Sequence, residues 1–252
     1  MLRSLNSILR YEINATDADL GKVDDFFFDD SNWRVRYFVV DTARWLGGRR
    51  VLISPVAVDR ADWAAHQLCV NLTKDQVEKS PGIEADEPVS RQMEKQLTSY
   101  YAWPVYWGPP GAELSPALAE GRARAAVAKA HEPKTSAPAD EGECTLRSIK
   151  EVTGYKIEAA DGGIGHVEDF IADEEDWTIR YMVVDTRNWL PGKKVLIAPW
   201  MIRSVRWGDT KVHLEMTRDQ VRAAPEYDPS APVNREYESR FYDYYGRPEY
   251  WH

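Results

Sequence analysis

The sequence has little of what disulfide frameworks, zinc clusters and membrane spans require. Its 252 residues include two cysteines, Cys69 and Cys144, at unrelated places, so neither a disulfide framework nor a zinc cluster is indicated. No apolar run reaches transmembrane length, and the repeated sequence begins at Leu2, which leaves no room for a cleavable signal peptide. We therefore expect a cytoplasmic protein with no membrane span.

The sequence also has fewer positive than negative charges and lacks the common catalytic motifs. The chain has 32 Lys and Arg against 41 Asp and Glu, and its net charge of -9 gives no general attraction for nucleic acid or anionic lipid. It contains no His-x-x-x-His or Cys-x-x-Cys pair, no nucleophile elbow and no phosphate-binding glycine loop. We expect no cofactor, no nucleic-acid partner and no enzymatic activity of a recognisable type.

What the chain does contain is an internal repeat, spaced by 144 residues without a gap. The clearest match joins Arg34–Pro55, RVRYFVVDTARWLGGRRVLISP, to Thr178–Pro199, TIRYMVVDTRNWLPGKKVLIAP. Each segment has an alternating β-branched and aromatic run, a connection and a return strand, which is typical of a β-hairpin. We predict duplication of a domain of about a hundred residues, with repeats at 1–107 and 145–252 and a linker at 108–144.

The rest of each half predicts further strands, short helices and an aromatic tail. We expect a first strand over Ser7–Ile13 and, at Thr73–Val77 and its copy, a helical turn capped by the threonine hydroxyl. A second helix is expected over Ser90–Tyr101 and its copy. In the linker, the alanine-rich stretch Ser115–His131 predicts a short helix within a tether.

The order of these motifs resembles the PRC-barrel family in both halves. A strand, a glycine, a VxDF-type strand, the RYxVVDTxxWLxGrkVLIxP pattern and a short helix follow one another over residues 2–80 and 146–224. The resemblance implies a mainly β protein of two tandem small, strongly bent barrels. The family includes the cytoplasmic domain of the photosynthetic reaction-centre H subunit and the C-terminal domain of RimM. The H subunit's membrane helix and RimM's extra N-terminal barrel have no counterpart here, so their roles are not carried over.

Carboxylates recur on the strand that follows the glycine of each half. Asp25 and Asp29 alternate along the first copy, as Asp169 and Asp173 do along the second. Carboxylates at alternate strand positions can converge on a hard cation such as calcium, so these four are the candidate metal ligands. The run lacks the spacing and glycine of a calcium loop. We therefore favour charges that discourage edge pairing, and we expect no metal.

Aromatic residues mark the hairpin connection of each copy. Trp45 and Leu46 are matched by Trp189 and Leu190, in a loop of the kind that often carries function. Burying an indole is worth on the order of 4 to 6 kcal/mol as an upper estimate, so two exposed indoles would be a liability. We favour packing within the protein. The alternative makes these four the candidate partner-binding residues.

Three function classes fit these observations. The leading class is a non-catalytic interaction or scaffold module, in which two tethered copies present related surfaces to a protein partner and gain from bivalency. The second is a binder of a small apolar or quinone-like molecule in a cleft lined by tryptophan. The third is an enzyme of unknown type. We expect the like halves to pair within one chain as an internal pseudo-dimer, rather than across two chains as a homo-oligomer.

Overall fold

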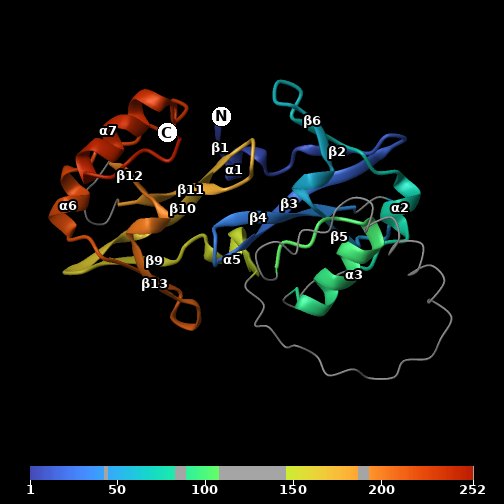
Figure 1. Cartoon of the computed structure of the whole chain (residues 1–252), viewed down its shortest axis with the longest axis horizontal. Coiled ribbons are helices and arrows are strands. Elements are labelled where there is room, and N and C mark those ends of the chain that lie inside the picture. The colour runs from blue at the N-terminus through green and yellow to red at the C-terminus, as the bar shows by residue number, and fades with distance from the viewer. Residues whose placement is uncertain (43–44, 83–88, 108–145, 187–192, 252) are drawn as a thin grey trace. The chain divides into compact units, whose positions relative to one another are not determined.

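The computed structural model describes residues 1–42, 45–82, 89–107, 146–186 and 193–251. Over these residues the protein is mainly β, as predicted, and its helices are short (Figure 1). No described helix combines the length and the apolar character that a membrane crossing requires. The helix predicted at Ser115–His131 lies outside the described residues.

The first copy contributes the strands of one sheet, a 3-10 turn at Pro55–Ala57 and short helices at both ends. Helices α2 and α3 confirm the predicted capped turn and second helix, because Thr73 and Ser90 each accept a hydrogen bond at the helix N-terminus. The elements are β1 (Leu2–Ser4), α1 (Leu5–Ile8), β2 (Glu12–Asn14), β3 (Asp19–Asp29), β4 (Arg34–Asp41), β5 (Arg50–Ile53), β6 (Val58–Asp62), β7 (Gln67–Val70), α2 (Lys74–Glu78) and α3 (Arg91–Tyr101).

The second copy repeats this order and adds one 3-10 turn, at Trp207–Asp209. Its caps repeat too, with Thr217 before α6 and Asn234 before α7. The elements are β8 (Leu146–Ser148), α5 (Ile149–Val152), β9 (Lys156–Ala159), β10 (Gly162–Asp173), β11 (Ile179–Asp185), β12 (Lys194–Ile197), 3-10 turns at Pro199–Met201 and Trp207–Asp209, β13 (Ile202–Arg206), β14 (Lys211–Leu214), α6 (Arg218–Ala223) and α7 (Arg235–Tyr245).

The predicted strand over Ser7–Ile13 is wrong in its first part. Residues Leu5–Ile8 form α1 instead, because the Ser4 hydroxyl accepts from the Ser7 amide at 3.1 Å and starts a helical turn. Arg10 then has a φ of 68°, which separates the turn from β2. A single helical turn is too short to show a periodic pattern, so no pattern in the sequence predicted it.

Each sheet has seven strands in a mixed arrangement. The strand paths run β5-β4-β3-β2-β7-β6 and β12-β11-β10-β9-β14-β13, with β2 parallel to β7 and β9 parallel to β14. Register shifts interrupt the pairing of β10 with both of its neighbours, and such bulges bend a sheet. Among the described strands these paths end without meeting, so the sheets are bent and open rather than closed barrels.

The seventh strand of each sheet comes from the other copy. Strand β1 pairs antiparallel with β10, with Leu2 opposite Asp173, and β8 pairs with β3. The contacts divide the chain into two compact units that therefore interleave the sequence halves. Unit 1 comprises Met1–Tyr11, Val23–Phe38 and Arg147–His252, and unit 2 comprises Glu12–Lys22 and the described part of Val39–Leu146. The boundaries at residues 107 and 145 describe the repeat and stay predictions.

An aromatic cluster forms part of the core of unit 1. Phe28 stacks on Trp33 with ring centroids 5.3 Å apart and meets Phe170 at 5.9 Å, while Phe38 meets Trp177 edge-on at 4.8 Å. The backbone joins the same elements, because Ile179 donates to the Trp33 carbonyl at 2.6 Å and Val35 to that of Trp177 at 2.9 Å. The start of β4 is thereby built into the same core as β11.

Two glycines at equivalent places allow the long strands β3 and β10 to cross their hairpins closely. Gly21 has a φ of 130° and Gly165 a φ of 152°. A Cβ at Gly21 would overlap the Asp41 carbonyl oxygen, and one at Gly165 would overlap that of Asp185. Both the backbone conformation and the space therefore require glycine.

We predict that Gly165→Ala lowers the free energy of unfolding by about 2 to 4 kcal/mol, since it adds a backbone clash to an unfavourable φ. Urea denaturation measures the change. Gly208→Ala is the matched control, because a Cβ there meets nothing within 4 Å. A Gly165→Ala protein as stable as the control would contradict this account.

Candidate functional site

The repeated carboxylates of β3 and β10 hold helical turns that belong to the other copy. Asp169 accepts from the Ser4 hydroxyl at 2.5 Å and the Asn6 amide at 3.0 Å, at the N-terminus of α1. Asp25 accepts from the Ser148 hydroxyl at 2.5 Å and the Lys150 amide at 3.1 Å, at the N-terminus of α5. These aspartates, which we predicted to discourage edge pairing, thus cap helices reciprocally within unit 1.

The other candidate metal ligands also bond to the protein. Asp29 accepts from the Ser31 amide at 3.0 Å and pairs with Arg36 at 3.2 Å. Asp173 accepts from the Glu175 amide at 3.2 Å. Across the part of the chain that the structure describes, no three His, Cys, Asp or Glu side chains gather in a way that would hold a metal ion.

Ion pairs reinforce the exchange of strands. The Arg3 Nε lies 2.7 Å from Glu174, next to β10, and the Arg147 Nε lies 3.0 Å from Asp30, next to β3. These pairs are half-buried, so each contributes more to register than an exposed pair would. Strands β1 and β8 are therefore each held by a backbone ladder, an aspartate that caps the following helical turn, and an arginine.

The hairpin tryptophan of the first copy packs within unit 2. The half-buried Trp45 donates its indole N–H to the Leu20 carbonyl at 2.8 Å, and the Lys74 ammonium lies 4.8 Å from the ring centroid. Leu46 is half-buried as well. Trp189 and Leu190 lie outside the described residues. Trp45 and Leu46 stay candidate partner-binding residues, but removing Trp45 also removes a hydrogen bond to β3.

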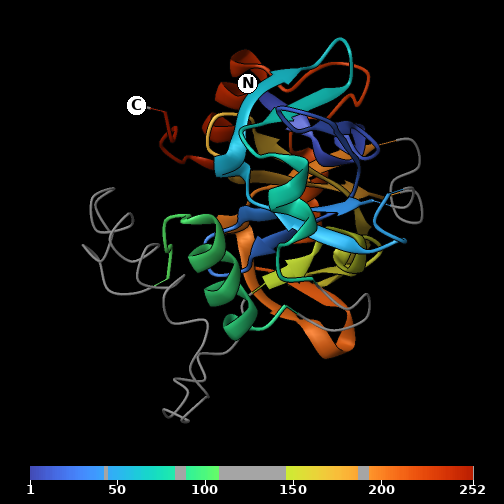
Figure 2. The same ribbon diagram turned by 90° about the vertical axis from the view of Figure 1, so that its right-hand side faces the viewer.

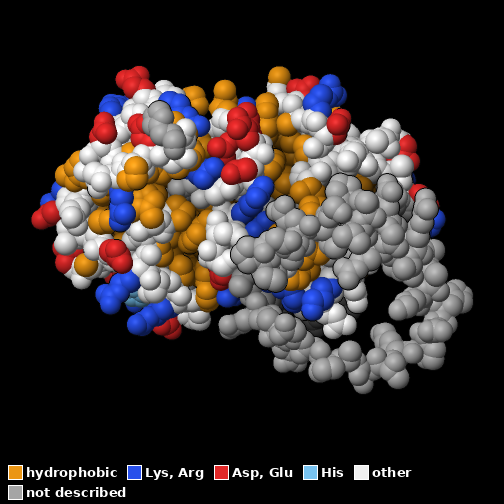
Figure 3. Space-filling view, viewed as in Figure 1, with side chains coloured by type: hydrophobic (Ala, Val, Ile, Leu, Met, Phe, Trp, Pro, Cys, Tyr) orange, Lys and Arg blue, Asp and Glu red, His pale blue; other side chains and the backbone are white. Residues whose placement is uncertain are grey.

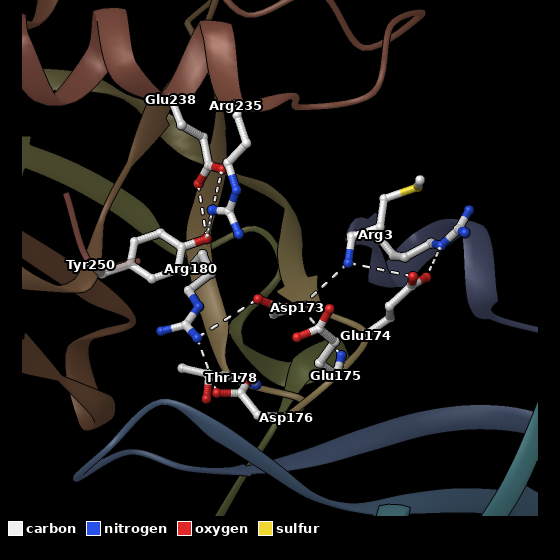
Figure 4. Close-up of polar contacts among 11 residues, drawn as sticks. Arg3, Asp173, Glu174, Glu175, Asp176, Thr178, Arg180, Arg235, Glu238 and Tyr250 are labelled. Carbon is white, nitrogen blue, oxygen red and sulfur yellow. Dashed lines mark hydrogen bonds and ion pairs between the residues drawn. The ribbon is translucent and has the colours of Figure 1, made fainter. Parts of the chain in front are cut away.

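A buried glutamate at the start of α7 is a site that our sequence analysis missed. Glu238 is 1% exposed and accepts from the hydroxyl groups of Tyr181 at 2.9 Å and Tyr250 at 3.0 Å. Arg235 donates to the same carboxylate at 2.9 Å and covers the Trp251 ring at 4.3 Å. Figure 4 shows Arg235, Glu238 and Tyr250 converging from the helix and the C-terminal tail.

The first copy has the same arrangement. Glu94 is fully buried, pairs with Arg91 at 2.6 Å and accepts from the Tyr106 hydroxyl, while Arg91 covers the Trp107 ring at 4.7 Å. The signal in the sequence was an Arg-x-x-Glu pair at 91–94 and 235–238, followed by Tyr-Trp at the same distance in both copies. We interpret it as a clamp that fastens each aromatic tail to its helix.

A pocket of about 320 Å³ adjoins the clamp of the second copy. Leu2, Val233 and Asp173 line it together with Arg235 and Glu238. Arg180 extends from β11 toward this region and reaches Asp176 at 3.0 Å, as Figure 4 shows. Burial raises the pKa of the Glu238 carboxyl, although Tyr181, Tyr250 and Arg235 oppose the rise by hydrogen bonding or charge. The hydrogen bond to Tyr250 uses the Glu238 carboxylate to hold the C-terminal aromatic tail.

A second hollow, in unit 2, lies between the end of α3 and the region of α2. It measures about 600 Å³, and we call it the aromatic hollow. In Figure 2, α2 and α3 face the viewer. Tyr101 and Trp103 stack with centroids 4.2 Å apart, and the Tyr100 hydroxyl donates to the Gln76 carbonyl at 2.8 Å. The lining residues are Val56, Asn71, Leu72, Gln76, Tyr100, Tyr101, Ala102 and Trp103.

We predict that replacing the two capping aspartates by asparagine removes part of the pH dependence of stability. Burial raises the pKa values of Asp25 and Asp169, against the hydrogen bonds from Ser148 and Ser4. A carboxyl with a raised pKa binds its proton more tightly in the folded protein than in the unfolded chain. Its contribution to the free energy of unfolding is therefore fully present below the unfolded pKa of about 4 and is lost as the pH rises through the folded pKa. Urea denaturation from about pH 4 to pH 7 measures this fall.

The Asp25→Asn, Asp169→Asn protein should show a smaller fall, since asparagine keeps an acceptor for the helix amides but has no proton to lose. Asp219→Asn, at an exposed side chain, is the control and should follow the wild-type profile. Wild-type pH dependence in the double variant would contradict the assignment of the fall to these two groups.

We predict that Glu238→Ala lowers the free energy of unfolding by about 2 to 4 kcal/mol, because it leaves Tyr181 and Tyr250 without their acceptor. Glu236→Ala, on the exposed face of the same helix, should change it by about 0.5 kcal/mol or less. Thermal and urea unfolding of both proteins test the clamp. Equal stabilities would show that the carboxylate does not hold the tail.

Two comparisons with known proteins find similarity to parts of this chain. A 106-residue stretch is 30% identical to part of a protein from Deinococcus radiodurans that is described as an uncharacterized protein. The match covers 36% of this chain and 38% of that relative. The sequence model of the PRC-barrel domain family matches residues 3–77, which run from β1 into α2. Residues 3–77 are therefore identified as a PRC-barrel domain.

Proposed function

We propose that this PRC-barrel protein is a non-catalytic protein-interaction module and that its first copy binds a protein partner at the aromatic hollow. The observation that carries the proposal is a hollow with fixed aromatic walls and an exposed apolar rim. Val56 is 52% exposed and Tyr100 41% exposed, and both line it. Large apolar side chains left in water at the rim of a hollow are typical of interaction sites.

The walls of the aromatic hollow are held in place before any partner arrives. Tyr100 is tied to α2 through the Gln76 carbonyl, and Tyr101 is stacked between its neighbours, with Tyr100 edge-on at 4.8 Å and Trp103 face-on at 4.2 Å. Aromatic side chains that are already ordered lose little conformational entropy on binding. Tyrosine and tryptophan are also the residues most enriched at protein interfaces.

The polar part of the lining suits a peptide. Asn71 and Gln76 are exposed at the hollow. The Asn71 amide can donate to a backbone carbonyl and accept from a backbone N–H, whereas the Gln76 oxygen already accepts from the Thr73 amide at 2.8 Å, so the Gln76 side chain serves as a donor. A volume of about 600 Å³ accommodates one large side chain with its flanking backbone. The hollow therefore combines an aromatic pocket with groups that pair with main chain.

The capping and clamping carboxylates of both copies serve the fold in this proposal. Asp25 and Asp169 cap helical turns, and Glu94 and Glu238 fasten the aromatic tails. Their hydrogen bonds run to backbone amides, tyrosines and arginines of the chain itself. Because these carboxylates hold the chain's own elements in place, they agree with a protein that presents a fixed surface to its partner.

We predict that a photo-crosslinking amino acid at Tyr100 captures a partner protein in living cells of the source organism. The same replacement at Tyr244 is the matched control, because Tyr244 is also 41% exposed and donates to the Gln220 carbonyl at 2.9 Å, as Tyr100 does to Gln76. Mass spectrometry should identify a discrete crosslinked protein with the Tyr100 variant and a much weaker signal with the Tyr244 variant.

Adding Val56→Trp to the Tyr100 variant should remove the crosslink, since an indole at position 56 fills the hollow. Circular dichroism and thermal unfolding check that this protein stays folded. Equal crosslinking at both tyrosines, or a crosslink that survives Val56→Trp, would contradict binding at the aromatic hollow.

A further inference from the structure

The second copy repeats three residues that line the aromatic hollow and has an indole beside them. Gln76, Tyr100 and Tyr101 recur as Gln220, Tyr244 and Tyr245, and the Tyr244 hydroxyl repeats the bond to the α6 carbonyl. At the position of Val56, however, the second copy has Trp200. The two copies thus share Gln76, Tyr100 and Tyr101 at this place and differ in the side chain at position 56 or 200, while Phe241 and Tyr242 beside Trp200 correspond to Leu97 and Thr98.

Trp200 is packed among the aromatic residues of α7. Its ring lies edge-on to Tyr245 at 5.5 Å and to Phe241 at 6.4 Å, and Tyr242 lies at 6.4 Å. The Arg247 guanidinium covers the ring at 4.9 Å, a cation–π contact. In Figure 3, hydrophobic side chains gather on the surface of unit 1 beside α7. The end of this helix therefore binds an indole supplied by its own chain.

The first copy does not reproduce that indole with another residue. Trp103 stands where the second copy has Arg247, but it lies flat on Tyr101, with an interplanar angle of 15° and a centroid distance of 4.2 Å. Trp200 meets Tyr245 at 77°. Because the two indoles meet the equivalent tyrosines in different orientations, Trp103 forms a wall of the hollow and leaves the position of Trp200 open.

We infer that the aromatic hollow takes a tryptophan side chain from a partner peptide, in the place that Trp200 occupies in the second copy. This inference rests on the proposed function and specifies the partner's chemistry. The indole would meet the edge of Tyr101, as Trp200 meets Tyr245, and Trp103 would supply an aromatic face where Arg247 supplies a cation. The amides of Asn71 and Gln76 would pair with the backbone on either side of the tryptophan.

The test is a titration of the isotopically labelled full chain with blocked pentapeptides, followed by NMR of backbone amides. The peptides have glycine at every position except the centre, which is tryptophan, phenylalanine or leucine. We expect the tryptophan peptide to shift the signals of Val56, Gln76 and Tyr100–Trp103, and to bind about tenfold more tightly than the leucine peptide. N-acetyl-tryptophan amide is the free aromatic probe and should bind more weakly than the peptide.

Two reciprocal variants decide whether the site is the one inferred. Val56→Trp should weaken binding of the tryptophan peptide by about tenfold or more, because the site is then filled. Trp200→Val opens the second copy and should add a second binding site, with shifts at Gln220 and Tyr244–Arg247. If Trp200→Val fails to fold, Val56→Trp alone decides, since it adds no cavity.

The outcomes separate this inference from the proposed function. Equal affinity of the tryptophan and leucine peptides, or unchanged binding by Val56→Trp, overturns the inference. Crosslinking at Tyr100 without tryptophan binding overturns the inference and leaves the interaction module intact. Equal affinity of N-acetyl-tryptophan amide and the peptide overturns the peptide assignment and identifies a small-molecule site.

Discussion

The exchange of one short strand and one helical turn between the copies is the constraint on which unit 1 depends. Asp25 is buried and Asp169 half-buried on long strands, and each accepts from the amide of the next residue and from a hydroxyl and a backbone amide that the other copy supplies. A buried carboxylate without such donors is costly. The same contact therefore satisfies the carboxylate, begins the helical turn and sets the register of the added strand. Duplication in one chain makes both halves of this exchange available at once.

The clamps at Glu94 and Glu238 follow the same physical logic within each copy. A carboxylate out of contact with water is surrounded by an arginine and tyrosine hydroxyl groups, and the arginine in turn covers a tryptophan. Electrostatic attraction, hydrogen bonding and aromatic contact thus meet at one place. The result is an aromatic tail fixed against its helix, so that α3 and α7 present ordered ends instead of fraying ones.

That order makes the difference between Val56 and Trp200 informative. Both copies have the same tyrosines and the same hydrogen bond from the tyrosine hydroxyl to a glutamine carbonyl of the preceding helix. They differ because Trp200 fills the space beside Tyr245, whereas the space beside Tyr101 is a hollow. After a duplication, one copy can keep a filled core that stabilises the fold while the other keeps an open one that binds. In this proposal the first copy has the open site, which is the aromatic hollow, and the second copy has the filled one.

The repeat, the hairpins, the cap at Thr73, the helix from Ser90 and the mainly β fold class were predictable from the sequence, because these depend on local patterns of alternation and capping that recur at a constant spacing. The sequence did not predict α1, whose single turn is held by Asp169 from a distant strand. It also gave the wrong reason for the acidic residues of β3 and β10, since exposure cannot be read from charge alone. The burial of Asp25, the pairing of β1 with β10 and the open hollow beside Tyr101 became visible in the folded protein alone, because each depends on residues far apart in the chain.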